Sequence, residues 1–297
     1  MMKPSHLIET ALLHGAAGVL GALPRPAALA LGEGLGSLLH GIGLRAKVAR
    51  ANLARAFPER DEAWRERLLA EHYRELGRTA ADYAHMRELV RAPREQTFAR
   101  YTGLDTARVA LALGKGIIFI SGHLGFFELL GAALSDLAPV AFVVKPMSNP
   151  GAEAWLSRLR RDCGIEPLPI GAGIRTVIKR LRAGGIVCMV GDQDARRDGV
   201  FVPFFGVPSS TPTGPAWLAL QTGAPVVFGT CLRAPDGRFF GHLDAMYLPP
   251  GDASDPEAVR ALTAWHTARL ERTVRERPES WFWLHKRWKT SPPPEAA

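Results

Sequence analysis

Cysteine is scarce in this chain of 297 residues, which has three in total, Cys163, Cys188 and Cys231. They are odd in number, widely separated and form no CxxC pair, which argues against a disulfide framework and a thiolate zinc site. The chain also lacks the GxSxG turn that presents a nucleophilic serine in many hydrolases. Any catalytic group must therefore be sought elsewhere.

A long uninterrupted apolar run is also missing. A spanning helix needs about 20 predominantly apolar residues, and the charge-free stretch 10–24 is too short for this. The charge-free stretch 199–232 is long enough, but five prolines would interrupt a helix there. At the N-terminus, Lys3 resembles the basic start of a signal peptide, but Glu9 interrupts the approach and no clean cleavage site follows. We expect the protein to stay on the cytoplasmic side.

The charge is biased towards the basic side, with 37 Lys and Arg against 29 Asp and Glu, a formal net charge of +8. Such an excess suits anionic partners, namely a membrane surface, a phosphorylated ligand or an acidic protein. Nucleic acid is disfavoured because no recognisable nucleic-acid-binding module accompanies the charge. The apolar fraction of 47% is sufficient for a substantial buried core.

The N-terminal segment 6–46 predicts two short apolar helices separated by Pro24-Arg25-Pro26. Two interpretations stay open for it: a helical lid on the domain, or an amphipathic anchor lying in the membrane interface. Basic residues follow directly and suit anionic headgroups: Arg45, Lys47, Arg50 and Arg55. We therefore divide the chain into a membrane-associating region (1–60), an α/β domain (61–290) and a tail (291–297).

The middle of the chain alternates short apolar runs with helical patterns. Runs of this kind are typical of strands buried on both faces, and they lie at 116–121, 139–144, 185–191 and 224–230. Helices are predicted between and around them, at 62–92, 125–135, 152–162, 173–183, 213–222 and 256–277. The pattern predicts an α/β fold with a mixed, largely parallel central sheet flanked by helices.

The strongest chemical motif is His123-x4-Glu128, which lies between a predicted strand and a predicted helix. Open α/β sheets bind their ligands at such strand ends. With His123 on the turn, its ring can fold back to Glu128, which would orient it as a general base. A capping histidine beside a surface carboxylate is the alternative. A metal site is disfavoured because no third ligand clusters nearby.

At this point the sequence resembles the bacterial lipid A late acyltransferases, the lauroyl and myristoyl transferases, a group that also includes phosphatidylinositol mannoside acyltransferases. The resemblance covers nearly the whole chain. It is carried by an ordered set of motifs: Asn52-Leu53, Phe57-Pro58, His123-x4-Glu128, Gly191-Asp192-Gln193-Asp194, Val202-Pro203-Phe204-Phe205-Gly206, Thr213-Gly214, Thr222-Gly223-Ala224 and Trp283-Leu284-His285-Lys286-Arg287-Trp288-Lys289-Thr290.

The resemblance implies a fold like that of glycerolipid acyltransferases and O-acyl transfer to a hydroxyl of a membrane glycolipid such as a lipid A precursor. The donor would be an acyl thioester on acyl carrier protein or coenzyme A, with no cofactor and no metal. His123 would act as general base with Glu128 as its partner, at the cytoplasmic face of the inner membrane. Lys145 replaces an arginine frequent in the family and would contact the headgroup.

Further residues are candidates on physical grounds, each with a structural alternative. Backbone amides near Gly125 suit an oxyanion. Phe204 and Phe205, in the charge-free stretch, suit a hydrocarbon-binding wall or a buried core. Asp192 and Asp194 suit an acceptor site or a turn, and Asp192 competes with Glu128 as the partner of His123. The basic candidates suit binding of an anionic substrate or a solvated surface: Arg158, Arg160, Arg175 and Arg287. Arg287 lies in an aromatic segment that suits a membrane interface or a buried plug.

Two rival functions remain at this stage. A lysophosphatidate-type glycerolipid acyltransferase would use a related motif and a different acceptor. A non-catalytic lipid-binding protein on the same fold would bind acyl chains without turnover. The sequence does not determine the acyl chain length, the donor or the acceptor.

Overall fold

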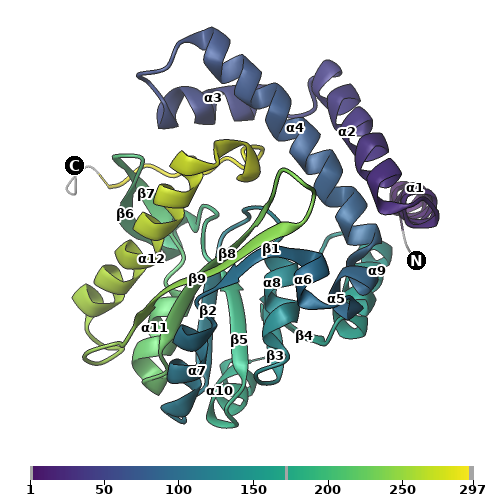
Figure 1. The fold of residues 1–297 in the computed structure, drawn as a ribbon. Helices are drawn as coiled ribbons and strands as arrows, with labels where there is room; N and C mark the ends of the chain where they lie inside the picture. Colours follow the sequence, from purple (N-terminus) through teal and green to yellow (C-terminus); the bar gives the residue numbers. More distant parts are fainter. Residues whose placement is uncertain (1–2, 171–172, 294–297) are drawn as a thin grey trace.

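The computed structural model describes residues 3–170 and 173–293, and its centre is a seven-stranded sheet (Figure 1). The strand order is β1-β9-β8-β2-β5-β3-β4. Strands β8, β2, β5, β3 and β4 run parallel, whereas β9 is antiparallel to β8 and parallel to β1. The strands are β1 (Phe98–Thr102), β2 (Ile117–Ser121), β3 (Val140–Val144), β4 (Ile165–Pro169), β5 (Ile186–Val190), β8 (Val226–Arg233) and β9 (Phe239–Tyr247). The predicted mixed, largely parallel sheet is confirmed.

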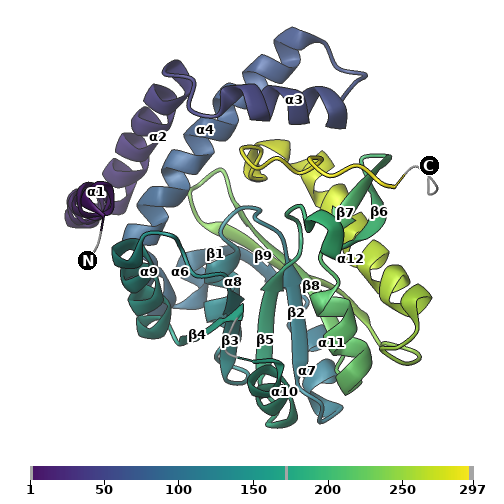
Figure 2. The same cartoon turned by 180° about the vertical axis from the view of Figure 1, so that it is seen from behind.

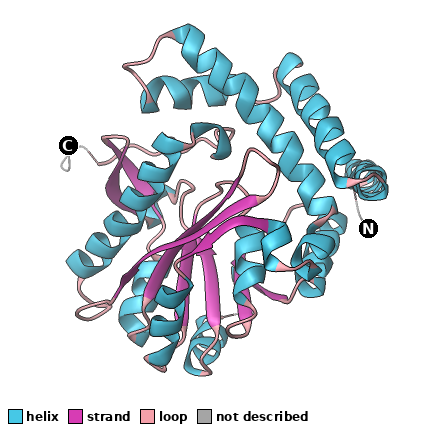
Figure 3. Ribbon diagram, viewed as in Figure 1, coloured by secondary structure: helices cyan, strands magenta, loops and turns pink. Residues whose placement is uncertain are grey.

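Helices cover both faces of this sheet (Figure 3). Strand β2 shows why, because Ile118 and Ile120 pack into one buried cluster while Ile117 and Phe119 pack into another. The first cluster includes residues of α10 (Ile174–Arg182), α11 (Gly214–Thr222) and α12 (Pro256–Glu276). The second includes residues of α5 (Met86–Arg91), α7 (Leu104–Ala112), α8 (Phe127–Leu134) and α9 (Pro150–Asp162). A strand buried on both faces reads as a continuous apolar run.

The three N-terminal helices pack against one long helix at the edge of the domain, and the second of them runs beside it (Figure 2). Helices α1 (Pro4–Ala22), α2 (Arg25–Gly41) and α3 (Ala46–Ala56) all contact α4 (Glu62–Ala84). Glycine allows the close approach of α2 to α4: a Cβ at Gly32 would lie 2.3 Å from the carbonyl oxygen of Gly77. The split at Pro24 is as predicted, but the single helix expected over 62–92 is interrupted at His85.

The outer surface of α1 and α2 is apolar and exposed. It carries Leu7, Ile8, Leu12, Val19, Leu31, Leu35, Leu38 and Leu39, each at least 37% exposed. No single helix within the described residues is long and apolar enough to span a membrane, although α2 and α3, bent by 91°, meet that criterion together.

The charge-free stretch 199–232 forms core elements of the fold. It builds a small antiparallel sheet of β6 (Val200–Phe204) and β7 (Val207–Thr211), then α11 and β8. Every residue of β8 is buried. The sequence did not predict the strands β1, β4, β6, β7 and β9 or the helices α6 (Arg94–Thr97) and α7. Of the predicted tail, residues 291–293 lack regular structure and residues 294–297 lie outside the described residues.

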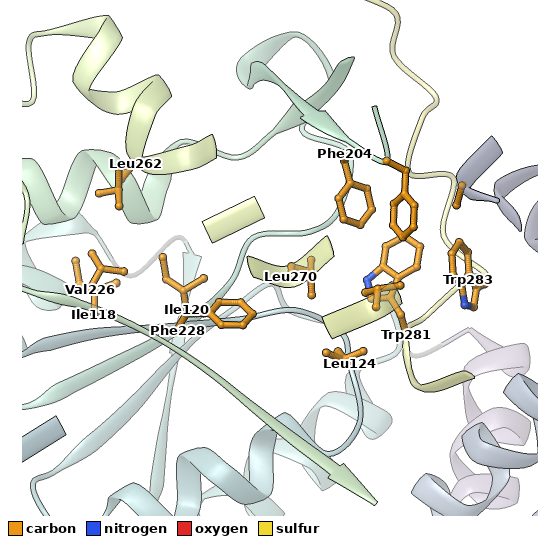
Figure 4. Close-up of a cluster of buried hydrophobic side chains, with 14 of the residues drawn as sticks. Ile118, Ile120, Leu124, Phe204, Val226, Phe228, Leu262, Leu270, Trp281 and Trp283 are labelled. Carbon is orange, nitrogen blue, oxygen red and sulfur yellow. The ribbon is translucent and has the colours of Figure 1, made fainter. Parts of the chain in front are cut away.

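The tryptophan-rich C-terminal segment is a buried plug, so the membrane-interface interpretation is wrong. Trp281 and Trp283 are 1% and 0% exposed, with ring centroids 4.6 Å apart. Phe204 packs against Trp281 at 5.4 Å (Figure 4). The side chain of Asn52 in α3 donates to the carbonyl oxygens of Trp283 and His285. These contacts join the N-terminal helices to the C-terminal segment.

Candidate active site

Two side chains meet where neighbouring parallel strands end. His123 follows β2 on the loop before α8, and Asp192 follows β5. Strands β2 and β5 pair in parallel with Ser121 opposite Val190. Both loops therefore leave the sheet at the same edge, where open α/β sheets place their ligands.

Asp192 holds His123 with both carboxylate oxygens. The Nδ1 of His123 lies 2.7 Å from Oδ1 of Asp192, and the backbone N–H of His123 donates to Oδ2 at 2.8 Å. The indole Nε1 of Trp281 also donates to Oδ2, at 2.8 Å. Because the carboxylate accepts at Nδ1, the proton sits on that nitrogen and Nε2 is left as the acceptor.

The charges of this pair stabilise each other. Burial by itself raises the pKa of Asp192. The charge of His123 and the hydrogen bonds from His123 and Trp281 lower it by more, so the pKa falls to about 2. Burial lowers the pKa of His123, but the charge and hydrogen bond of Asp192 outweigh it, so the pKa lies above the ordinary value of 6.5. A carboxylate that stays ionised beside an imidazole suits a general base with a stabilised protonated form.

His123 borders a small cavity and is reachable from solvent. Its side chain is 32% exposed. The cavity holds about 160 Å³ and is lined by α4 residues, by Phe127 and by Phe282. The ring of Phe127 lies edge-on to the imidazole at 5.8 Å. The site thus has a fixed base beside a partly apolar space.

The predicted pairing of His123 with Glu128 is wrong, since Glu128 is hydrogen-bonded to Arg160 instead. Arg160 Nη2 donates to Glu128 Oε1 at 2.6 Å, and Arg160 Nε donates to Oε2 at 3.1 Å. The glutamate is 1% exposed. Tyr83 hydrogen-bonds to the same carboxylate, and its own pKa is raised by burial and by that charge. Glu128 lies in the first turn of α8 on the face towards α9, and its remaining effect on His123 is to raise its pKa through space.

Gly125 does not offer a free amide for an oxyanion. Its N–H donates to the carbonyl oxygen of Ser280 at 2.9 Å. The residue has φ +58°, and a Cβ there would lie 2.1 Å from the carbonyl oxygen of Cys231. Glycine is therefore required by this close approach to the sheet, and the expected oxyanion role is corrected.

Three further candidates are structural. Arg287 is 1% exposed, and its guanidinium donates to the carbonyl oxygen of Ser210 and to the hydroxyl of Thr211. Burial lowers its pKa to about 10. Phe204 and Phe205 are buried in the aromatic cluster, and neither lines the cavity beside His123. We correct all three from substrate-binding to core positions, because Arg287 is itself part of the buried C-terminal segment and the indoles of that segment pack against both phenylalanines.

The remaining predicted residues lie in the loops after β3 and β5 or on the helices α9 and α10. Lys145 is exposed just after β3, at the same sheet edge as His123. Asp194 accepts from the hydroxyl of Thr290 at 3.0 Å, and its N–H donates to Nε2 of His285 at 3.1 Å. Arg158 and Arg175 are exposed on α9 and α10. Asp194 fastens the loop after β5 to the C-terminal segment.

A larger apolar cavity opens at the ends of β3, β4 and β5. It holds about 520 Å³, and its lining includes Val143, Met189, Val190, Ile174 and Trp217. Of these, Trp217 lies in the charge-free stretch that the sequence marked as a hydrocarbon wall. Residue patterns alone did not single out the aliphatic members, because apolar residues in strands are also ordinary core.

Trp281 is the functional contact that sequence reasoning missed. The sequence gave no signal that its indole would reach Asp192, 89 positions away. The sequence did single out Asp192, because it follows a strand expected to be parallel to β2. Paired parallel strands end at the same sheet edge, and this places Asp192 beside His123.

Comparisons with known proteins agree with this architecture. Residues 3–290 match the family described as bacterial lipid A biosynthesis acyltransferase. The chain is 29% identical to the lipid A biosynthesis lauroyltransferase of Escherichia coli (strain K12), over 96% of this chain and 95% of that protein. It is 26% identical to the palmitoleoyltransferase of the same strain, over 93% and 89%. It is 31% identical to the phosphatidylinositol mannoside acyltransferase of Mycobacterium tuberculosis (strain CDC 1551 / Oshkosh), over 63% and 58%.

Proposed function

Because the chain belongs to the bacterial lipid A biosynthesis acyltransferase family and is therefore an acyltransferase, we propose that it acylates a hydroxyl of a lipid A precursor or a similar glycolipid. The donor is an acyl thioester on acyl carrier protein or coenzyme A. His123 is the general base, and Asp192 takes the partner role that the sequence assigned to Glu128. The names of the relatives support the acceptor class.

The contact between His123 and Asp192 carries this mechanism. His123 Nε2 takes the proton of the acceptor hydroxyl while Nδ1 remains hydrogen-bonded to Asp192. The hydroxyl oxygen attacks the thioester carbonyl, an oxygen–carbon bond forms, and the carbon–sulfur bond breaks. The leaving thiolate takes up the proton from the imidazolium, which returns His123 to its neutral form. No acyl-enzyme is required.

The apolar cavity is the proposed site of the transferred acyl chain. Val190 in its lining precedes Asp192 by two residues, so the loop that carries Asp192 starts at the wall of this cavity. Each methylene buried there contributes about 0.8 kcal/mol. The depth of a cavity limited by Trp217 and Ile174 would set the preferred chain length.

The exposed apolar surface of α1 and α2 is the proposed contact with the inner membrane. Its leucines are available to enter the interface, and Lys47 and Arg55 are placed after it for anionic headgroups. The exposed cations Arg158 on α9 and Arg175 on α10 suit an acidic carrier or a phosphorylated donor.

The direct test is His123→Ala in purified enzyme, with the transfer of an acyl group to a lipid A precursor measured by mass spectrometry. Loss of the base should lower kcat by about 10²- to 10⁴-fold. His242→Ala is the control, since His242 is an exposed histidine on β9 that lines only a separate surface cavity. Wild-type turnover in the His123→Ala enzyme would refute the mechanism. If the enzyme acylates lysophosphatidate and not the glycolipid, the acceptor is a glycerolipid. If the protein binds acyl chains without turnover, it is a lipid-binding protein.

A further inference from the structure

A polar cavity, separate from the cavity beside His123 and from the apolar cavity, lies between α2, α4 and the turn that joins β8 to β9. It holds about 600 Å³. In Figures 1 and 2 this turn reaches towards α4 beside the N-terminal helices. We propose that this cavity binds the hydroxyl-rich sugar part of the acceptor, and not a phosphate. The inference rests on the proposed function and assigns a location to the acceptor.

The polar cavity adjoins the catalytic one. Glu75 and Glu279 line both the polar cavity and the cavity that contains His123. A ligand filling the polar cavity would therefore present its nearest hydroxyl towards the imidazole. The apolar cavity, whose lining includes Val190 two residues before Asp192, has no lining residue in common with these two cavities. Acceptor and acyl chain would thus approach His123 from separate cavities.

The charge of the polar cavity disfavours phosphate. Five carboxylates line it against three guanidiniums. Each guanidinium is already paired: Arg78 with Glu33 at 2.8 Å, Arg233 with Glu75 at 2.9 Å, and Arg277 with Glu279 at 2.7 Å. A phosphate would face an excess of negative charge and no unpaired cation among these lining residues.

The same groups suit sugar hydroxyls, which donate and accept. Carboxylate oxygens accept from hydroxyls, and guanidinium N–H groups donate to them. Arg233 is only 9% exposed, yet its Nη2 has no hydrogen-bond partner among the described residues. That nitrogen is itself covered by protein atoms, so the donors open to a sugar hydroxyl are those of Arg78 and Arg277, whose side chains are 23% and 35% exposed.

The position of α2 also suits a lipid-linked sugar. Leu29 and Ala30 line the cavity, whereas Leu31, Leu35 and Leu38 are exposed on the helix. The helix that carries the apolar outer surface therefore also forms a wall of the polar cavity. An acceptor whose acyl chains stay in the bilayer and whose sugars project out of it would extend past α2 into the cavity.

The test fills the cavity from α2. Ala30→Trp places an indole at the cavity wall, and Ala27→Trp places the same side chain at an exposed position of the same helix that does not line it. With detergent-dispersed lipid A precursor, Ala30→Trp should raise the KM for the acceptor by about 10-fold or more, equivalent to about 1.4 kcal/mol. The KM for the acyl thioester and the kinetics of Ala27→Trp should stay within about 2-fold of wild type.

A second pair of variants tests the charge. Asp236→Asn removes a carboxylate from the cavity, and Asp105→Asn removes one from α7, each aspartate being paired with a nearby surface arginine. Only Asp236→Asn should raise the acceptor KM, by about 3-fold or more.

The outcomes separate the two proposals. If wild-type enzyme acylates no glycolipid, the proposed function fails. If it does and Ala30→Trp matches Ala27→Trp, the cavity assignment is overturned. The factor by which Ala30→Trp raises KM should be equal for the lipid A precursor and its phosphate-free derivative. A factor seen only with the phosphorylated acceptor would show that the cavity holds phosphate, which would overturn the sugar assignment.

Discussion

At the scale of single residues, the position of Asp192 decides which nitrogen of His123 carries the proton and leaves Nε2 as the acceptor. Its two oxygens accept from His123 Nδ1, from the His123 backbone N–H and from Trp281. The ring is therefore fixed in orientation and in tautomer, and Nε2 faces the reaction. A base fixed in this way needs no reorganisation when the acceptor hydroxyl arrives.

Replacing Asp192 should move the pH dependence of the reaction. The pKa of His123 is raised by Asp192, and the unprotonated base is present only above that pKa, so the acidic limb of kcat/KM should lie above pH 6.5. Asp192→Asn removes the charge, so the limb should shift to lower pH while the plateau falls by about 10²-fold or more. Asp194→Asn, two residues on, is the control. A limb that stays in place in Asp192→Asn would contradict the pairing.

At the scale of secondary-structure elements, Glu128 and Arg160 join α8 to α9. Both side chains are nearly buried, at 1% and 10% exposed. The loop with His123 leads directly into α8, so this ion pair fixes the helix behind the site. The glutamate of the histidine-glutamate motif thus acts here through the placement of α8.

Breaking this pair from one side should be more costly than removing it. Glu128→Gln leaves the Arg160 charge buried, and Arg160→Met leaves the Glu128 charge buried, so each should lower the free energy of unfolding by about 3–5 kcal/mol. The double variant should recover much of that loss. Denaturant unfolding monitored by fluorescence measures these values. The exposed pair of Arg180 and Glu166 gives the comparison, where Glu166→Gln should cost under about 1 kcal/mol. Strictly additive losses in the double variant would argue against a buried pair.

At the scale of the whole molecule, three surfaces matter to the reaction proposed at His123. The apolar face of α1 and α2 is exposed, the polar cavity lies beneath α2, and the apolar cavity opens at the ends of β3 to β5. An acceptor held in the membrane and an acyl chain from a carrier would meet at His123. Peripheral attachment to the bilayer is therefore part of the proposed reaction.

One substitution tests that attachment. Leu38 is 62% exposed on α2, and Leu38→Glu should weaken binding to anionic phospholipid vesicles by about 10-fold, because an apolar side chain is replaced by a charge. Val109→Glu on α7 is the matched control, since Val109 is 55% exposed on a different helix. Vesicle co-sedimentation measures both. Equal binding of the two variants would exclude α2 as the membrane contact.

The sequence predicted the central strands because residues such as Ile118 and Phe119 are apolar on both faces of β2. It did not predict β1, β4 and β9. Strand β9 interrupts its apolar residues with Gly241, His242 and Asp244, and β4 contains two prolines. Patterns of this kind are ambiguous until a partner strand supplies hydrogen bonds.

Of the site, the sequence by itself singled out His123, its place after a buried strand, and the family resemblance, since these depend on local pattern. Only the tertiary structure decided that Asp192 and not Glu128 is its partner. That choice depends on the parallel register of β2 with β5 and on α9, whose Arg160 takes the glutamate. The burial of Trp281 and Arg287 and the enclosure of the polar cavity were likewise decided by packing. Segments far apart in the chain create these environments, and no local pattern records which of them will meet.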